Sequence, residues 1–300
     1  MTALKLLLVY NPFAGFGKSG KVFTEIKQLI RDKGMDFDLR FTRAAGEATK
    51  MVQEADLSLY DGVISSGGDG TLHEVLNGYY KNSGSTKPPI GIIPNGTGNA
   101  FAFEIGLDTF DYKKAIDIIA NHKIKKVDIG HCQMQEGDFY FHNILGFGMV
   151  ADINEAAKKY KKLGNHSYSI ASMEKILALR TFDLEIILDG KTIKQDNLFV
   201  EISNTTHTGS DFIMAPEAKI DDGLLDVTIS RKTSRWNVLK IFAQVFKGAH
   251  IHHPDIEYIK AKEIIVKTKE NKTLTPDGEQ YGTTPITVNC LKEKLEFFWS

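Results

Sequence analysis

Gly67-Gly68-Asp69-Gly70-Thr71 follows an apolar stretch at residues 62–66 and precedes a segment in which Leu72, Val75 and Leu76 would share one face of a helix. The apolar stretch is typical of a buried strand, and the spacing after it predicts a helix. A glycine-rich turn between a strand and a helix lets backbone N–H groups converge, because glycine tolerates positive φ and has no side chain to block a ligand. The stretch therefore predicts an anion site, and phosphate is the usual anion there.

Asp69 is the unusual residue of this turn, since a carboxylate would repel a phosphate group. Its presence indicates a cation between the two groups, and Mg²⁺ held through water suits a carboxylate beside phosphates. A tight turn with a helix-capping aspartate is the alternative interpretation.

Alternating strand and helix patterns surround this turn. We expect strands at residues 4–10, 37–42, 62–66 and 90–93, and helices at 18–33, 47–55, 100–105 and 111–121. Strands alternating with helices imply a parallel sheet with right-handed crossovers. In such sheets ligands bind beyond the carboxyl ends of the strands. Asn11, Thr42 and the Gly67 turn all fall at those ends, so these segments predict one common site.

From Lys123 onward the pattern becomes mostly β. We expect strands at residues 124–134, 138–145, 182–188, 198–203, 224–230, 256–259, 263–267 and 286–288, and helices near 150–162, 168–179 and 234–246. The predicted fold is an α/β N-terminal domain with a three-layer parallel sheet, followed by a mostly β C-terminal sandwich domain. We expect the first domain at residues 1–127 and the second at 128–289, with residues 290–300 packing back on the first.

The composition is that of an ordinary globular protein, with 42% hydrophobic and 25% charged residues. A length of 300 residues favours two domains. The net charge of −1 gives no general attraction to nucleic acid. Cys132 and Cys290 are too few for a disulfide framework, which suits a reducing cytoplasm. No signal peptide and no run of about 18 apolar residues is visible, so we expect a chain that does not span a membrane.

Two further patterns carry less weight. Residues 15–20 match G-x-G-x-x-G, but residues 11–14 separate them from the strand, so a dinucleotide loop is disfavoured, and Pro12 stands where a Walker loop needs its first glycine. Basic residues at 158–162 and 231–236 could contact anionic lipid headgroups. The alternative interpretation is that each stretch is a solvent-exposed face with no such role.

Two acidic turns in the second half leave alternatives open. Asp277-Gly278-Glu279 is either a solvated hairpin tip or a loop that presents a general base. Asp221-Asp222-Gly223-Leu224-Leu225-Asp226 carries hard oxygen donors at close spacing, and an acidic turn without an ion is the other interpretation.

Four segments together resemble the diacylglycerol kinase catalytic-domain family, which includes bacterial lipid kinases, sphingosine kinases and ceramide kinases. The segments are Asn11-Pro12 with its glycines, Gly67-Gly68-Asp69-Gly70-Thr71, Pro94-Asn95-Gly96-Thr97-Gly98-Asn99, and Asp277-Gly278-Glu279. Their order covers nearly the whole chain. The resemblance implies an ATP- and Mg²⁺-dependent lipid kinase that phosphorylates a lipid hydroxyl, of diacylglycerol or a sphingoid-type lipid, with ATP in a cleft between the two domains.

The resemblance also assigns roles to individual residues. The positions similar to the family's ATP contacts are Asn11, Pro12, Phe13, Ala14, Gly15, Thr42, Gly67, Gly68, Asp69, Gly70, Thr71 and Thr97. Asp69 matches the acid that reaches the catalytic Mg²⁺ through water, and Asp128 matches a second such acid. Glu279 matches the general base, with Asp277 beside it. In sphingosine kinases the acid matching Asp69 is itself the base, so the division between Asp69 and Glu279 stays open.

A structural Mg²⁺ site of bacterial lipid kinases is implied at Asp222 and the backbone carbonyl of Leu224. The chain departs from several bacterial diacylglycerol kinases at Ala100, where they carry an aspartate. That departure implies that fewer, or differently arranged, side chains surround the water molecules bound to the metal.

Residues 146–153 and 159–164 are similar to a segment of sphingosine kinases. There the acid matching Asp152 faces the polar head of the sphingoid base, so Asp152 is the expected lipid-head residue. The implied partner is a lipid at the membrane surface, met by a cytoplasmic protein in peripheral association, and a homodimer is left open. The alternatives are an enzyme like NAD kinase, which shares the glycine and aspartate run, and a lipid-binding protein with a disabled site.

Overall fold

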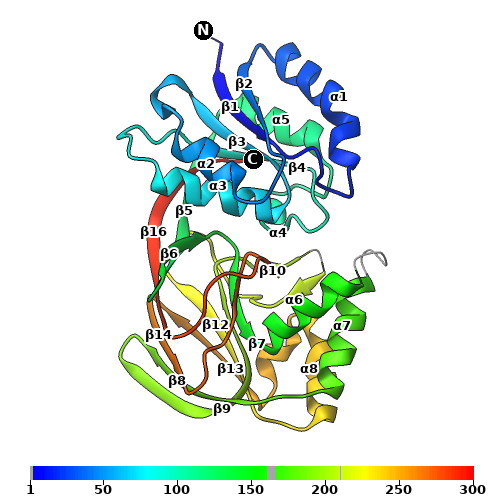
Figure 1. The fold of residues 1–300 in the computed structure, drawn as a ribbon, viewed down its shortest axis with the longest axis vertical. Helices are drawn as coiled ribbons and strands as arrows, with labels where there is room; N and C mark the ends of the chain where they lie inside the picture. The colour runs from blue at the N-terminus through cyan, green and yellow to red at the C-terminus, as the bar shows by residue number, and fades with distance from the viewer. Residues whose placement is uncertain (1–2, 161–165, 210) are drawn as a thin grey trace. The chain divides into compact units, whose positions relative to one another are not determined.

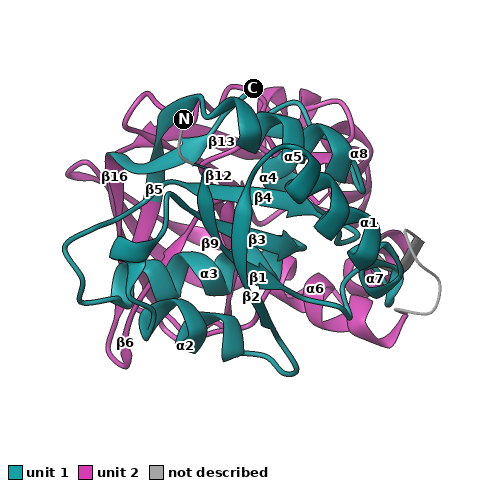
Figure 2. Ribbon diagram, turned by 90° about the horizontal axis from the view of Figure 1, so that it is seen from above, with its two compact units in different colours: residues 1–129, 293–300 teal, residues 130–292 magenta. Residues whose placement is uncertain are grey.

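A computed structural model describes residues 3–160, 166–209 and 211–300 of the chain. The chain divides into two compact units (Figures 1 and 2). Unit 1 contains residues 1–129 and 293–300, and unit 2 contains residues 130–292. Two strands, β5 (Ile124–Met134) and β16 (Ile286–Phe298), run from one unit into the other.

Unit 1 is built on a parallel sheet. Its strands are β1 (Lys5–Tyr10), β2 (Asp36–Phe41), β3 (Gly62–Gly67) and β4 (Ile90–Pro94), in the order β4-β3-β1-β2, and Phe297 of β16 pairs with Ile90 of β4. The central strands β1, β3 and β4 are almost wholly buried, as expected for parallel strands that helices cover on both faces. Their apolar sequences therefore lie in the core of this unit.

Helices cover both faces of this sheet (Figure 2). They are α1 (Lys18–Asp32), α2 (Glu47–Gln53), α3 (Asp69–Lys81), α4 (Ala100–Glu104), α5 (Tyr112–Asn121) and the 3-10 turn η1 (Leu57–Leu59). Helices α2 and α3 pack together on one face, and α1 and α5 pack together on the other. The predicted three-layer arrangement of the first domain is confirmed.

Unit 2 is mostly antiparallel β. Its strands are β6 (Gly137–Phe141), β7 (Ile144–Gly148), β8 (Phe182–Leu188), β9 (Lys191–Ser203), β10 (His207–Thr208), β11 (Phe212–Ile213), β12 (Leu225–Arg231), β13 (Ile256–Ala261), β14 (Glu263–Thr268) and β15 (Leu274–Pro276). The long strand β9 pairs with β8 through its first half and with β7 and β12 through its second half. This shared strand lets the sheet fold over the largest apolar cluster of unit 2, as expected for the predicted sandwich, and a second cluster lies between Leu198 and Phe199 of β9 and the helices.

Three helices accompany these strands, α6 (Met149–Lys159), α7 (His166–Leu177) and α8 (Arg235–Val245), with the 3-10 turn η3 (Ala249–His252). Three strand predictions were incomplete. The strand expected at residues 198–203 begins earlier, at Lys191. The strand expected at residues 138–145 is interrupted at His142 and Asn143, because their backbone N–H groups bind a side chain rather than a neighbouring strand. The strand expected at 286–288 continues to residue 298. None of the helices in the described residues is both long and apolar enough to cross a bilayer.

Candidate active site

Three turns of unit 1 meet at the carboxyl ends of parallel strands. The register sets Tyr10 of β1 opposite Ser66 of β3, and Gly67 of β3 opposite Pro94 of β4. The Gly67 carbonyl then accepts the N–H groups of Asn95 at 2.8 Å and of the next residue, Gly96, at 2.9 Å. The predicted convergence of these motifs therefore occurs within unit 1.

Asparagine side chains lock the turns to one another. Asn11 Nδ2 donates to Thr71 Oγ1 at 3.2 Å, and Asn11 Oδ1 accepts the N–H of Phe13 at 3.0 Å. Asn95 Nδ2 donates to Ser66 Oγ at 2.8 Å and is fully buried. These bonds order the turns before any ligand arrives, which is what an anion site of backbone N–H groups requires.

Two glycines allow the turns to approach each other closely. A Cβ on Gly96 would lie 2.3 Å from the Cα of Gly68, and a Cβ on Gly15 would lie 2.6 Å from the carbonyl oxygen of Asn95. Gly15 also has φ +59°, a conformation that favours glycine. The glycines of the predicted motifs are thus needed for packing backbone against backbone.

Asp69 is the first residue of α3, directly after the extended Gly68, and it is half-buried. With Gly68 and Asn99 it lines a small hollow in unit 1. No group of three or more His, Cys, Asp or Glu side chains is arranged to hold a metal in the part of the chain that the structure describes. A single carboxylate at a phosphate turn fits Mg²⁺ whose other ligands are water and phosphate oxygens.

The other residues predicted to contact the nucleotide lie on the same turns or directly after β2. They are Pro12, Phe13, Ala14, Gly15, Gly70, Thr97 and Thr42. Thr42 is buried, and its N–H donates to the carbonyl of Tyr10 at 3.0 Å. Phe13 and Thr97 are exposed.

Glu74 of α3 is a positioning residue that the sequence did not reveal. Its carboxylate accepts the N–H groups of Gly46 at 2.8 Å and Ala48 at 3.0 Å, at the start of α2. An acid is favourable at a helix N-terminus, but nothing in the sequence indicates that this acid comes from a different helix.

Asp128, implied as a second acid near Mg²⁺, is fully buried in unit 1. Its Oδ1 accepts the N–H of Glu293, a residue with φ +50°, at 2.7 Å. Here Asp128 holds the returning end of β16 through one carboxylate oxygen, and its expected role near Mg²⁺ stays a prediction.

The turn that carries Glu279 is anchored in unit 2 by Asp277. Asp277 Oδ1 accepts the N–H groups of Asn143 at 2.9 Å and Ile144 at 3.2 Å. Its Oδ2 accepts the N–H of His142 at 3.3 Å and lies 2.9 Å from that residue's ring Nδ1. The Asp277 side chain is fully buried, so this carboxylate fixes the turn rather than meeting solvent.

Glu279 itself is exposed at the end of this turn. Its N–H donates to the carbonyl of Pro276 at 2.8 Å, and its carboxylate makes no ion pair or hydrogen bond within the described residues. The Gly278 carbonyl accepts Nδ2 of Asn154, on α6, at 2.6 Å. The sequence did not single out Asn154 or His142, because neither lies near residue 278 along the chain.

Asp222 of the predicted structural Mg²⁺ site has a cationic side chain beside it. Its Oδ1 accepts the N–H of Leu224 at 3.0 Å, and its Oδ2 lies 3.2 Å from Lys260 Nζ. Asp152, the predicted lipid-head residue, is half-buried in the first turn of α6. The adjoining predicted segment 159–164 lies largely outside the described residues.

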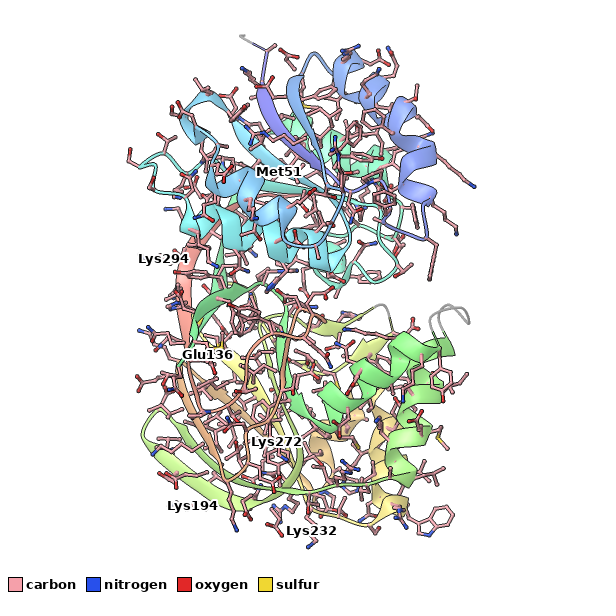
Figure 3. The ribbon with its side chains drawn as sticks, in the orientation of Figure 1. Met51, Glu136, Lys194, Lys232, Lys272 and Lys294 are labelled. Atoms are coloured by element: carbon pink, nitrogen blue, oxygen red, sulfur yellow. The ribbon has the colours of Figure 1, made fainter. Side chains whose placement is uncertain are left out.

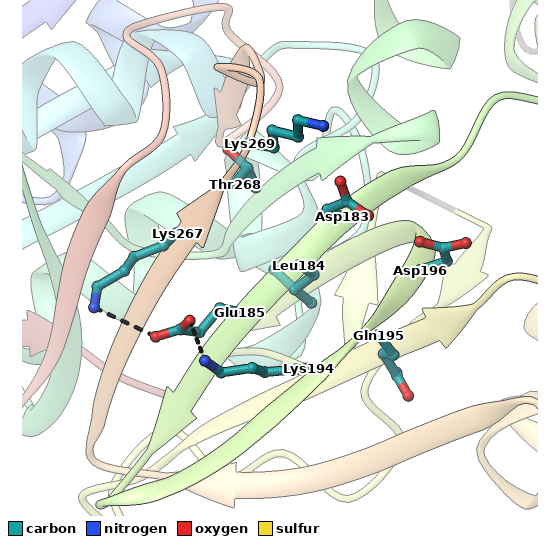
Figure 4. Close-up of a pocket in the computed structure, with 9 residues that line it drawn as sticks. All are labelled: Asp183, Leu184, Glu185, Lys194, Gln195, Asp196, Lys267, Thr268 and Lys269. Carbon is teal, nitrogen blue, oxygen red and sulfur yellow. Dashed lines mark hydrogen bonds and ion pairs between the residues drawn. The ribbon is translucent and has the colours of Figure 1, made fainter.

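A broad hollow lies on the outer face of β8, β9 and β14 in unit 2 (Figure 4). Its charges pair with one another, since Glu185 binds Lys194 at 2.7 Å and Lys267 at 3.4 Å. Lys232, labelled in Figure 3, lies 3.5 Å from Asp196, which also lines this hollow. None of the residues that line this hollow is a predicted catalytic, nucleotide or metal residue, and we interpret it as a solvated sheet surface.

Comparison with known proteins gives a consistent result for both units. Residues 5–132 match the diacylglycerol kinase catalytic domain, and residues 143–299 match the YegS C-terminal NAD kinase beta sandwich-like domain. A diacylglycerol kinase of Bacillus subtilis (strain 168) is 32% identical, with 96% of this chain and 97% of that protein covered. A diacylglycerol kinase of Mycobacterium tuberculosis is 30% identical, with coverage of 97% and 94%.

Two solved structures from Bacillus anthracis str. Sterne are similar over all of this chain. The first has a TM-score of 0.84 at 28% identity and is covered over 96% of its length. The second, named a diacylglycerol kinase, has a TM-score of 0.76 at 25% identity and is covered over 98%.

Proposed function

Because this chain belongs to the diacylglycerol kinase family of lipid kinases, we propose that it transfers the γ-phosphoryl group of ATP to a hydroxyl group of diacylglycerol. The observation that carries the phosphoryl-transfer chemistry is the meeting of three glycine turns at the carboxyl ends of β1, β3 and β4 in unit 1. Phosphoryl transfer relies mainly on positioning and charge neutralisation, and backbone N–H groups at a helix start supply both.

In this proposal unit 1 holds the nucleotide. The turns at Asn11, Gly67 and Asn95 would receive the phosphates, with Thr42 beside them. Asp69 would hold Mg²⁺ through water, and the ion would neutralise charge on the transferred group. The half-burial of Asp69 in the first turn of α3 supports this role, because phosphates favoured by the N–H groups of a helix start would lie near this residue.

Glu279 is the proposed general base of the reaction. An exposed carboxylate on a turn that a buried neighbour anchors can orient a hydroxyl group and accept its proton as the phosphoryl group is transferred. Asp277 would act through Glu279 by holding the turn, so we assign it a positioning role.

Diacylglycerol is favoured as acceptor because the full-length relatives are named diacylglycerol kinases. A sphingoid base is the second candidate, supported by the half-buried Asp152, whose carboxylate could pair with an ammonium group. Either acceptor resides in a bilayer, so we propose peripheral association with a membrane surface on the cytoplasmic side.

A panel of acceptors tests this proposal. Purified protein is incubated with radiolabelled ATP and Mg²⁺ and with diacylglycerol, monoacylglycerol, sphingosine or ceramide in mixed micelles, with NAD⁺ in solution, or with no acceptor. We expect label in phosphatidic acid. Label in sphingosine 1-phosphate would favour the Asp152 interpretation, and label only in NADP⁺ would assign the chain to the NAD kinase alternative. Labelling of no acceptor would support a disabled lipid-binding protein.

A further inference from the structure

The acidic turn before β12 receives a lysine from the neighbouring strand β13. Lys260 Nζ lies 3.2 Å from Asp222 Oδ2 and 3.5 Å from Asp226 Oδ1, and it donates to the carbonyl of Glu217 at 2.7 Å. Asp226 and Lys260 are direct partners in the antiparallel register of β12 and β13. The ammonium group therefore reaches three oxygens on both sides of the turn.

At least one of the carboxylates involved is buried and has few hydrogen-bond donors, so a nearby cation would stabilise it. The Asp226 side chain is 1% exposed, and its Oδ2 makes no hydrogen bond within the described residues. Tyr258, also on β13, donates its hydroxyl to Asp226 Oδ1. A buried carboxylate with so few donors needs a positive charge nearby, because desolvation disfavours its charged form.

The turn does not fit the structural Mg²⁺ that the family resemblance implies at Asp222 and Leu224. Mg²⁺ requires about six oxygens at about 2.1 Å in octahedral geometry. Of the two oxygens of Asp222, one is engaged by the Leu224 N–H and the other faces the Lys260 ammonium. A divalent ion beside Asp222 would meet the positive charge of Lys260 at close range.

We propose that the Lys260 ammonium group is the internal cation of this turn. It takes the place of a structural divalent ion and holds residues 217–226 against β13. The ammonium donates to the Glu217 carbonyl and pairs with Asp222 and Asp226, and so joins the loop before β12 to β13. Its side chain is 27% exposed, which is enough burial for the pairing to exceed that of an ordinary surface ion pair.

Thermal unfolding without nucleotide tests the proposal, because its readout needs no turnover and is independent of the proposed function. The wild-type melting temperature should be the same in EDTA and in millimolar Mg²⁺. Lys260→Met should melt roughly 5 °C lower in EDTA, because it leaves the buried Asp226 carboxylate without its cation. Lys262→Met makes the same chemical change at an exposed residue of the adjacent turn and should melt like the wild type.

Two results would overturn the proposal. One is a wild-type melting temperature that rises with Mg²⁺ and falls with EDTA, if Asp222→Asn abolishes this response and Asp69→Asn does not. That pattern would locate a bound ion in unit 2. The other is a Lys260→Met variant as stable as the wild type. If Lys260→Met does not fold, calorimetric titration of wild-type protein and Asp222→Asn with Mg²⁺ decides, and equal heats for the two support the internal cation.

Discussion

The two units anchor their acidic turns in opposite ways. In unit 1 the turn before α3 is held from the backbone, where the Gly67 carbonyl accepts two N–H groups and the glycines permit close approach. In unit 2 the turn before Glu279 is held by a side chain, because the carboxylate of Asp277 accepts three backbone N–H groups. The same dipeptide, Asp-Gly, thus begins a helix in unit 1 and is an internal anchor in unit 2.

The burial of each acid indicates which one is available for chemistry. Asp277 is fully buried and accepts backbone N–H groups, whereas Glu279 is exposed and has no described partner for its carboxylate. Asp69 is half-buried at a helix start, beside N–H groups that suit phosphates. The comparison therefore supports the proposed division, with the base in unit 2 and the metal tether in unit 1.

The largest expected effect follows from removing the proposed base. Glu279→Gln should lower turnover by about 100-fold or more, since general base catalysis contributes about 10²–10⁴-fold. The melting temperature should not change, because the side chain makes no described contact. Steady-state assays with diacylglycerol and ATP measure the loss, and Glu270→Gln, the same change at an exposed acid outside the motifs, should retain wild-type turnover.

Asp69→Asn is the matched change in unit 1. It should also abolish most turnover, but only this variant should alter the Mg²⁺ concentration needed for half-maximal rate. If Glu279→Gln shifts the metal dependence and Asp69→Asn does not, the two roles are exchanged and the comparison between the units fails.

The convergence in unit 1 could be predicted from the sequence because it follows from local rules. Apolar runs end at Tyr10, Ser66 and Ile93, and parallel strands bring their carboxyl ends to one edge of a sheet. Small residues directly after each strand then mark the site. The contact between Asn11 and Thr71 adds detail but changes no part of that prediction.

The anchoring in unit 2 could not be predicted in the same way. Asp277 contacts residues more than 130 positions earlier, and no local periodicity encodes such a pairing. The length of β16 was missed for a related reason. Charged residues at 292–294 interrupt its apolar alternation, although the backbone continues as a strand. The contact between Lys260 and the acidic turn could not be predicted either, because it depends on the register between β12 and β13, which only the folded chain reveals.

Glu201 is a contrasting buried acid, because in the described part of the chain its carboxylate does not accept backbone N–H groups as that of Asp277 does. It is fully buried on β9, its Oε1 accepts Thr208 Oγ1 at 2.5 Å, and its Oε2 has no described partner. Burial raises its pKa to about 7. The folded chain therefore binds a proton that the unfolded chain releases at lower pH, and stability should fall as pH rises from about 4.5 to about 7.

The upper limit of this loss is about 3 kcal/mol, since each unit of pKa difference corresponds to about 1.4 kcal/mol. Urea unfolding at several pH values measures it. The difference in unfolding free energy between Glu201→Gln and wild type isolates this group from others. One of the others is the buried His250: burial lowers its pKa to about 4, so its contribution to stability changes with pH in the opposite direction. A difference independent of pH would show that Glu201 does not titrate in this range.

Asp277→Asn tests whether the anchor depends on the carboxylate. Asparagine tolerates the positive φ of 47° at this position, so the backbone conformation is not the variable. One oxygen is kept, but the amide NH₂ would face the N–H of His142, and an unsatisfied buried donor costs about 1–3 kcal/mol. Urea unfolding should register that loss, and turnover should fall with it. Asp183→Asn, at an exposed residue of β8, should change neither quantity.

Substitution of Asn154 should give the smallest effect and the most specific one, because its Nδ2 holds the Glu279 turn by donating to the Gly278 carbonyl. Loss of one hydrogen bond costs about 1 kcal/mol, so Asn154→Ala should lower kcat roughly fivefold. The KM for ATP should not change if the nucleotide is held by unit 1. Asn154→Asp keeps the size but replaces the donor with a second acceptor, and it should lower kcat at least as much. Glu155→Ala, at the exposed neighbouring residue of α6, should leave kcat unchanged. A fall in stability with unchanged kcat would make Asn154 merely structural and would leave Asp277 as the one identified anchor of the proposed base.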